Sequence, residues 1–130
     1  MTSTYLLSPD QIVWIMLGLV IKHFICDFLL QNKYQWSNKH IWGHPGGILH
    51  SLIHVIGTIL VGYIVVPQLL GIFFVISLIE GILHYTIDFS KQNINIAMDW
   101  TSNNSEFWIL LGVDQLAHYM CYIGILTYLV

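Results

Sequence analysis

Charged side chains are scarce in this sequence, and arginine is absent from it. Only 8% of the 130 residues are charged, whereas a typical soluble domain carries about 25%. The four basic residues are all lysines, and the formal net charge is −3. A protein that binds nucleic acid needs a basic face or stripe, so this charge balance argues against a nucleic-acid partner.

Motifs that define several enzyme classes are also missing. Cys26 and Cys121 both lie inside apolar segments rather than in a CxxC pair, so the sequence predicts neither a redox motif nor a disulfide framework. It contains no nucleophile motif and no glycine-rich phosphate loop. The N-terminal residues carry no basic cluster, so we expect the first apolar segment to be a retained helix rather than a cleaved signal peptide.

Hydrophobic residues, in contrast, make up 56% of the chain, and the mean hydropathy is +0.71. This composition predicts a single all-α membrane domain over residues 1–130. A helix of about 20 apolar residues crosses a hydrocarbon core of about 30 Å. Four apolar runs meet that requirement and predict a transmembrane four-helix bundle. The runs lie at about 9–31, 45–66, 67–89 and 105–130.

Two local patterns indicate where helices begin. Ser8 precedes Pro9, and Gln11 follows three positions after the serine, which is the pattern of a capping box with proline in the first turn. Pro67 cannot continue one helix but suits the start of the next. The second and third spans are therefore expected to form a tight hairpin.

The lysines indicate how the bundle is oriented. Polar connections are predicted at 32–44 and 90–104, and residues 93–100 alternate between apolar and polar types, as expected of a segment in the membrane interface. The lysines of these connections are Lys33, Lys39 and Lys91. The positive-inside rule then places both connections in the cytoplasm and both termini outside the cell membrane.

The most informative pattern is a set of ionisable residues spaced four apart inside the apolar runs. A spacing of four puts both members of a pair on one helix face. Ionisable groups within a membrane helix are costly and normally face the bundle interior. The four pairs are His23/Asp27, His50/His54, His84/Asp88 and Asp114/His118. All four are predicted in the cytoplasmic half, so we expect them to form one polar His/Asp centre.

The residue types of this centre point to a metal. Imidazole and carboxylate together suit Zn, Mn or Fe, and eight candidate ligands exceed the four that one zinc ion usually takes. The acidic residues Asp27, Asp88, Asp114 and Glu80 total −4 if ionised, which two divalent ions would neutralise. The sequence therefore predicts one or two divalent transition metal ions. Hydrogen bonding between helices, without a metal, is the alternative.

Two further residues are candidates for catalysis. Glu80 lies one turn deeper on the face of His84 and Asp88, where it could bind the metal, orient a histidine or act as a general base. Lys22 lies in the same apolar run as His23, but its side chain is rotated about 100° from that of His23 around the helix axis. Its ammonium is expected either to reach the interface or to hold an anionic substrate group such as phosphate.

The ordered set of motifs resembles a known family. The set consists of His23-Phe-Ile-Cys-Asp27-Phe-Leu-Leu-Gln31, His50-xxx-His54, His84-xxx-Asp88 followed by Lys91, and Asp114-Gln115-xx-His118. Together these resemble the DUF3307 family, small integral membrane proteins of bacteria and phages whose function is unknown. The resemblance implies a four-helix membrane domain and brings no established activity. A weaker analogy is to membrane-bound metal-dependent hydrolases, which also carry His and Asp in their helices.

Three functions remain open from the sequence. The first is a metal-dependent hydrolase or transferase that acts on a lipidic or phosphorylated substrate near the cytoplasmic interface. The second is a metal-ion or proton transporter or channel, although residues 56–66 and 69–79 offer almost no polar groups. A homo-oligomer could supply a path between protomers. The third is a regulatory membrane module without catalytic activity that a metal staples together.

Overall fold

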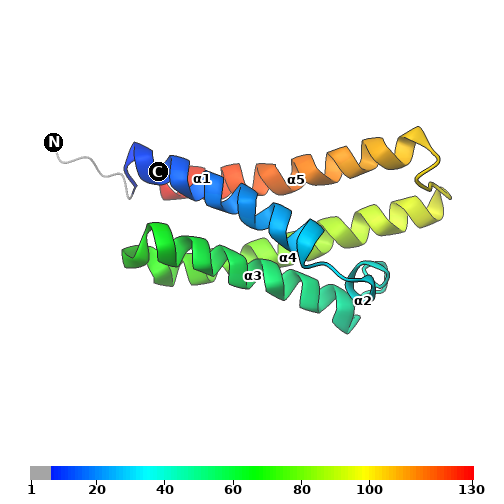
Figure 1. The fold of residues 1–130 in the computed structure, drawn as a ribbon, viewed down its shortest axis with the longest axis horizontal. Coiled ribbons are helices and arrows are strands. Elements are labelled where there is room, and N and C mark those ends of the chain that lie inside the picture. Colours follow the sequence, from blue (N-terminus) through cyan, green and yellow to red (C-terminus); the bar gives the residue numbers. More distant parts are fainter. Residues whose placement is uncertain (1–6) are drawn as a thin grey trace.

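The computed structural model describes residues 7–130, and within them the chain is helical with no β-strand. Four long helices lie side by side along one axis, and a short fifth helix caps one end (Figure 1). In chain order the elements are α1 Pro9–Phe24, a π-helical turn Ile25–Leu29, α2 Lys33–Trp36, α3 Pro45–Val65, a 3₁₀ turn Pro67–Leu69, α4 Leu70–Ala97 and α5 Ser105–Leu129.

The helix starts follow the local sequence. The Ser8 side chain accepts from the backbone of Gln11, whose side chain in turn accepts from the Ser8 backbone, so the predicted capping box is confirmed. Pro67 opens the 3₁₀ turn that leads directly into α4, which confirms the predicted hairpin. Four helical segments are long and apolar enough to cross a membrane, and the predicted fold class, a transmembrane four-helix bundle, is therefore confirmed.

Helix α4 is longer than the sequence predicted. We expected the third span to end near residue 89 and residues 93–100 to lie in the interface, but α4 continues to Ala97. In this extension Ser90 and Asn93 donate to backbone carbonyls one turn earlier, so their polar groups are paired within the helix. From Pro67 to Ala97 the segment spans 31 residues, or about 45 Å, longer than the bilayer core of about 30 Å.

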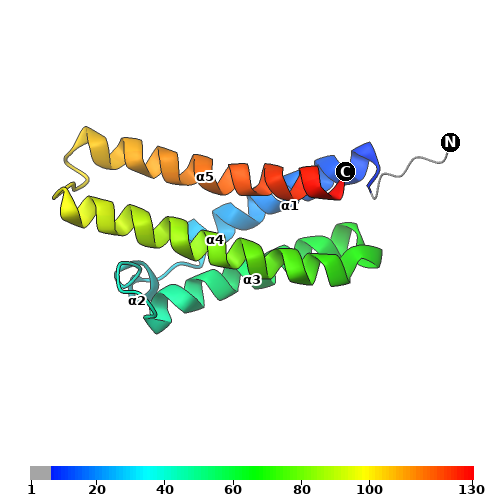
Figure 2. The ribbon, with the colours of Figure 1, turned by 180° about the vertical axis from the view of Figure 1, so that it is seen from behind.

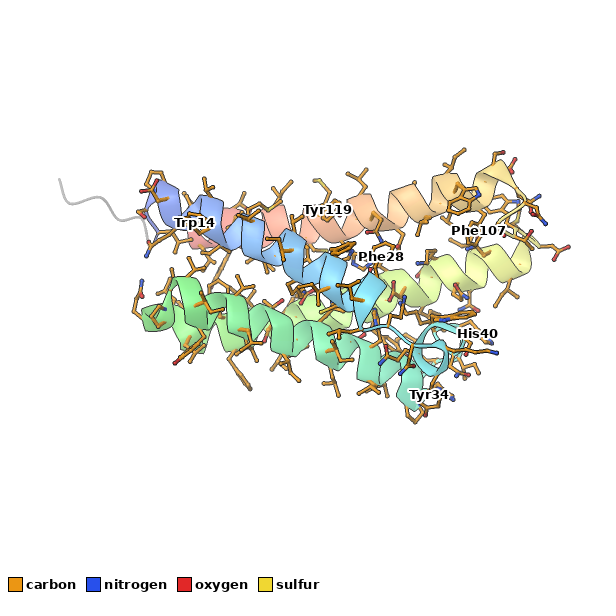
Figure 3. The ribbon with its side chains drawn as sticks, in the orientation of Figure 1. Trp14, Phe28, Tyr34, His40, Phe107 and Tyr119 are labelled. Atoms are coloured by element: carbon orange, nitrogen blue, oxygen red, sulfur yellow. The ribbon has the colours of Figure 1, made fainter. Side chains whose placement is uncertain are left out.

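The four long helices form a closed ring, in which α1 contacts α3 and α5, and α4 also contacts α3 and α5. Both ends of the described chain and the α3–α4 turn lie at one end, called here the terminal end (Figure 2). The α2 segment and the α4–α5 connection lie at the other, called the loop end, where α4 and α5 extend beyond α1 and α3 (Figure 1). Figure 3 places His40 at the loop end and Trp14 toward the terminal end.

An apolar core fills the terminal half of this ring. Its members come from all four long helices and include Ile15, Leu19, Val61, Phe73 and Leu126, each at most 9% exposed. A closed apolar core at this end means that polar groups deeper in the bundle face the loop end and not the terminal end. The core therefore determines from which side the polar centre can be approached.

Close contact between α3 and α4 depends on glycine in this core. A Cβ atom added to Gly62 would overlap the ring of Phe73, which is fully buried and cannot move aside. We expect Gly62→Ala to destabilise the protein by about 1–3 kcal/mol through overpacking. The matched control is Gly124→Ala, because Gly124 faces open space; there alanine should be neutral or stabilise by about 0.5–1 kcal/mol. Unfolding in detergent measures both, and equal stabilities for the two variants would contradict this packing.

Candidate metal centre

All eight residues of the four predicted pairs lie together in the middle of the bundle. Each is at most 8% exposed, and they come from all four long helices. Three overlapping sets of their side chains each offer ligand atoms that lie within 4.8 Å of one another. The buried polar His/Asp cluster expected from the sequence is therefore confirmed, whereas the ligand role of each residue stays a prediction.

The tightest set, called here the four-donor group, consists of Asp27, His50, His54 and His84. Its Asp27 Oδ1 atom lies 2.9 Å from His54 Nε2 and 3.0 Å from His50 Nε2. The Nε2 atom of His84 lies 3.7 Å from the same Asp27 oxygen and 3.0 Å from the Nε2 atom of His50. Donors that share one tetrahedral zinc ion at 2.0–2.1 Å would be about 3.3 Å apart, so these spacings fit a common cation.

A second set, called here the carboxylate group, consists of Asp88, Asp114 and His118. The His118 Nε2 atom lies 3.5 Å from Asp88 Oδ1 and 3.5 Å from Asp114 Oδ1. This set touches the first one, because Asp88 Oδ2 is 3.2 Å from His84 Nε2. His23 completes the centre, with its Nε2 atom 3.1 Å from Asp27 Oδ2. The two groups are therefore adjacent parts of one cluster.

Several buried atoms in the carboxylate group lack hydrogen-bond partners. Oδ1 of Asp88, Oδ1 of Asp114 and Nε2 of His118 are in this condition, whereas Asp88 Oδ2 lies within ion-pair distance of Lys39. An unsatisfied buried polar atom typically costs about 1–3 kcal/mol. Buried polar atoms normally have partners, so this concentration of lone pairs fits a site that binds a cation.

Three of the four lysines neutralise the buried carboxylates. Lys39 Nζ lies 2.6 Å from Asp88 Oδ2, and Lys91 Nζ lies 3.1 Å from Asp114 Oδ2. Lys22 is also buried and pairs with Glu80 at 2.9 Å. The sequence analysis placed Lys39 and Lys91 in cytoplasmic loops, but Lys91 is part of α4 and the Lys39 side chain is only 6% exposed. The charge count from the sequence left out these ammonium groups.

Glu80 belongs to a polar layer directly below the centre on its terminal side. Its two carboxylate oxygens accept from Lys22 Nζ and from Thr58 Oγ1, each at 2.9 Å. Glu80 Oε1 also lies 4.0 Å from His54 Nδ1, on the ring edge opposite the nitrogen that faces Asp27. Lys22 therefore reaches neither the interface nor open solvent. The catalytic roles of Glu80 and Lys22 stay predictions, and the structure shows that the two groups pair with each other.

Sequence reasoning missed two residues of α5 that contact the centre. The Tyr122 hydroxyl lies 3.0 Å from His23 Nδ1 and 3.2 Å from Lys22 Nζ. Gln115 Oε1 lies 3.0 Å from His23 Nε2. Tyr122 was detectable, because it continues the Asp114/His118 face by a further step of four. Gln115 is adjacent to Asp114 in sequence and had no periodic pattern to mark it.

The two cysteines and the loop residue His44 lie outside the centre. Cys26 is directed toward the Ile53 carbonyl at 3.9 Å, and Cys121 is a free, half-buried thiol. The His44 side chain accepts from the Gly46 backbone at the start of α3. None of these groups belongs to the candidate ligand sets of the described residues. The donors of the centre are therefore imidazole and carboxylate, without a thiolate.

A family model described as "Protein of unknown function (DUF3307)" matches residues 15–130. The matched segment contains all of the centre residues as well as the lysines that pair with the centre carboxylates. No curated protein and no solved structure matches the chain. The resemblance noted in the sequence is confirmed, and it assigns no activity.

The Lys22–Glu80 pair permits a direct test of this geometry. Removing one partner leaves a buried charge without compensation, so Lys22→Met and Glu80→Gln should each destabilise the protein by about 3–5 kcal/mol. The double variant Lys22→Met/Glu80→Gln leaves no such charge and should be far closer to the wild type. Unfolding in detergent gives the coupling energy, with the exposed Glu106→Gln as control. Additive single losses would show that the two groups do not interact.

Proposed function

The chain belongs to the DUF3307 family of proteins of unknown function, and we propose that it binds a divalent transition metal ion inside the membrane. The ion is held by the four-donor group, with the Nε2 atoms of three histidines and one carboxylate oxygen of Asp27. A donor set of imidazole and carboxylate without thiolate supports Zn, Mn or Fe. Four protein donors match the coordination number that zinc adopts most often.

The observation that carries this proposal is the orientation of the imidazole rings. The Nε2 atoms of His50 and His84 are 3.0 Å apart, and both face Asp27 Oδ1. One proton shared between them would satisfy the pair, but the unprotonated Nε2 would then turn its lone pair toward a carboxylate oxygen, because Asp27 Oδ1 lies 3.0 Å from His50 Nε2 and Asp88 Oδ2 lies 3.2 Å from His84 Nε2. A cation resolves this conflict, because each ring then presents a lone pair at Nε2. Simple hydrogen bonding between helices would not require three imidazoles around one oxygen.

We propose that the centre is that of a hydrolase or transferase whose substrate is lipidic or phosphorylated. A bound divalent ion that accepts a fifth ligand beside the four protein donors would activate water and polarise a phosphoryl or acyl oxygen, whereas a strictly four-coordinate zinc ion would be a structural site. Glu80 is then a positioning residue, since its carboxylate lies behind His54 and favours a proton on Nδ1. The apolar core at the terminal end supports approach of the substrate from the loop end. The predicted orientation would make this the cytoplasmic side.

The same apolar core weighs against transport as the primary function. A pathway across the membrane needs polar groups or water along its length, but Ile15, Leu19 and Phe73 fill the terminal half of the ring and are fully buried. Among the described residues, apolar grooves reach Glu80 between α4 and α5 and Lys22 between α1 and α3 from the sides of the bundle. A single chain therefore supports a site closed at the terminal end better than a channel.

We expect protein purified without chelator to contain bound Zn, Mn or Fe by elemental analysis. His54→Ala should lower that content strongly, because His54 is fully buried and contributes one of four donors. Zinc sites usually lose affinity together with stability, so the variant should also melt at a lower temperature. His40→Ala is the control, because His40 lies in the loop segment outside the ligand sets. A folded wild type that stays free of metal after incubation with all three ions would exclude the proposal.

Catalysis is tested separately from metal binding. The double variant Lys22→Met/Glu80→Gln, which leaves no unpaired charge at this position, should retain the metal, since all four donors remain, but lower kcat for release of phosphate or headgroup by about 10–100-fold. The amide carries no negative charge beside His54 Nδ1, so the pH profile of the remaining activity should shift as well. Activity is measured on a panel of lipid-linked phosphates. If fully metallated wild type releases product from none of them, the regulatory metal-stapled module becomes the better interpretation.

A further inference from the structure

The two parts of the centre differ in how their negative charge is balanced. The four-donor group contains one carboxylate, Asp27, and has no lysine within ion-pair distance among the described residues. The carboxylate group contains two, and each is paired with an ammonium group, Asp88 with Lys39 and Asp114 with Lys91. A metal ion and an ammonium group compete for the same oxygen atoms.

Lys39 occupies a carboxylate oxygen that a second ion would need. In two-metal sites the ions lie about 3.5–4 Å apart, and protein groups bridge them. Here Asp88 Oδ2 faces Nε2 of His84 and of His50, at 3.2 and 3.4 Å, and on its other side Lys39 Nζ at 2.6 Å. The Asp88 carboxylate, which would bridge the ions of a two-metal site, therefore connects the four-donor group to the Lys39 ammonium group. Lys91 adds a second ammonium 4.0 Å from Asp88 Oδ1.

Lys39 is held in this position by the surrounding structure. The segment that follows it is fixed to α4 at two points, by Asn93 Nδ2 donating to the His40 carbonyl and by Gly43 N–H donating to the Tyr85 hydroxyl. The Lys39 backbone also passes close to Gly47, where a larger residue would come into contact with it. The ammonium group is thus directed inward by tertiary contacts rather than by its local sequence.

The charges of the whole cluster agree with a single ion. The four buried carboxylates contribute −4, and the three paired lysines contribute +3. With neutral histidines the cluster then carries −1, and one divalent ion brings it to +1. Two divalent ions would bring it to +3 in a low-dielectric interior, which is strongly unfavourable. The two-ion count from the sequence considered only the acidic residues.

We infer that the centre holds one metal ion, at the four-donor group, and that the ammonium groups of Lys39 and Lys91 supply the positive charge that a second ion would bring to the carboxylate group. This inference rests on the proposed metal binding and specifies its stoichiometry. It also assigns a function to two lysines that composition alone would place at the membrane surface. Removing an ammonium group should therefore create a second metal site from the existing carboxylate group.

The test is the number of Zn²⁺ ions bound per chain in detergent, measured by equilibrium dialysis and elemental analysis. Wild type should bind one ion. Lys39→Met keeps the aliphatic stem, removes the charge and exposes Asp88 to the metal, so it should bind two. The second ion should also raise the melting temperature of Lys39→Met, because a ligand that binds only the folded state stabilises it. Lys91→Met is a second variant in case Lys39→Met fails to fold.

Two controls separate this effect from a general loss of positive charge. Lys33→Met removes the same charge from an exposed position on α2 and should still bind one ion. Lys39→Met/Asp114→Asn removes a ligand of the carboxylate group alone and should return to one ion. Two ions on the wild type, or one ion on both lysine variants, would overturn the inference while leaving the metal proposal intact. No ion on the wild type would instead reject the metal proposal itself.

Discussion

Neutralising buried carboxylates inside an apolar bundle is the requirement on which the rest of this structure depends. Four buried acidic side chains lie within the membrane-crossing helices, and each is at most 8% exposed. An uncompensated charge in such a place costs several kcal/mol. The protein meets the requirement in two ways: lysines from three different segments pair with Glu80, Asp88 and Asp114, and imidazoles surround Asp27.

The architecture around the centre follows from that requirement. A closed ring of four helices keeps lipid away from the charged groups, and close approach at Gly62 lets α3 and α4 seal against each other. The apolar core then closes the terminal half. The α2 segment lies at the loop end (Figure 1), and apolar grooves reach Glu80 and Lys22 from the sides of the bundle. A polar site that is closed at one end is better suited to binding a molecule, or to catalysing its reaction, than to conducting an ion across the membrane.

Asp27 differs from the other three carboxylates in the groups that surround it, and this difference marks where in the centre a metal ion could bind. It has histidines as neighbours where the others have ammonium groups. Neutral imidazoles offer lone pairs that a metal can use, whereas an ammonium group offers none. The distribution of lysines therefore distinguishes the part of the cluster suited to a metal from the part that is already neutralised. A composition-based count of acidic residues cannot make this distinction.

The sequence by itself determined the four spans, the helix starts at Ser8 and Pro67, and the set of eight centre residues. These depend on local properties, because apolar length, capping and a spacing of four are each expressed within one helix. The tertiary structure decided the length of α4, the burial of Lys39, the pairing of Lys22 with Glu80 and the participation of Tyr122. Which lysine pairs with which carboxylate depends on how the separate helices and the α2 segment pack. No periodicity along a single helix encodes that choice.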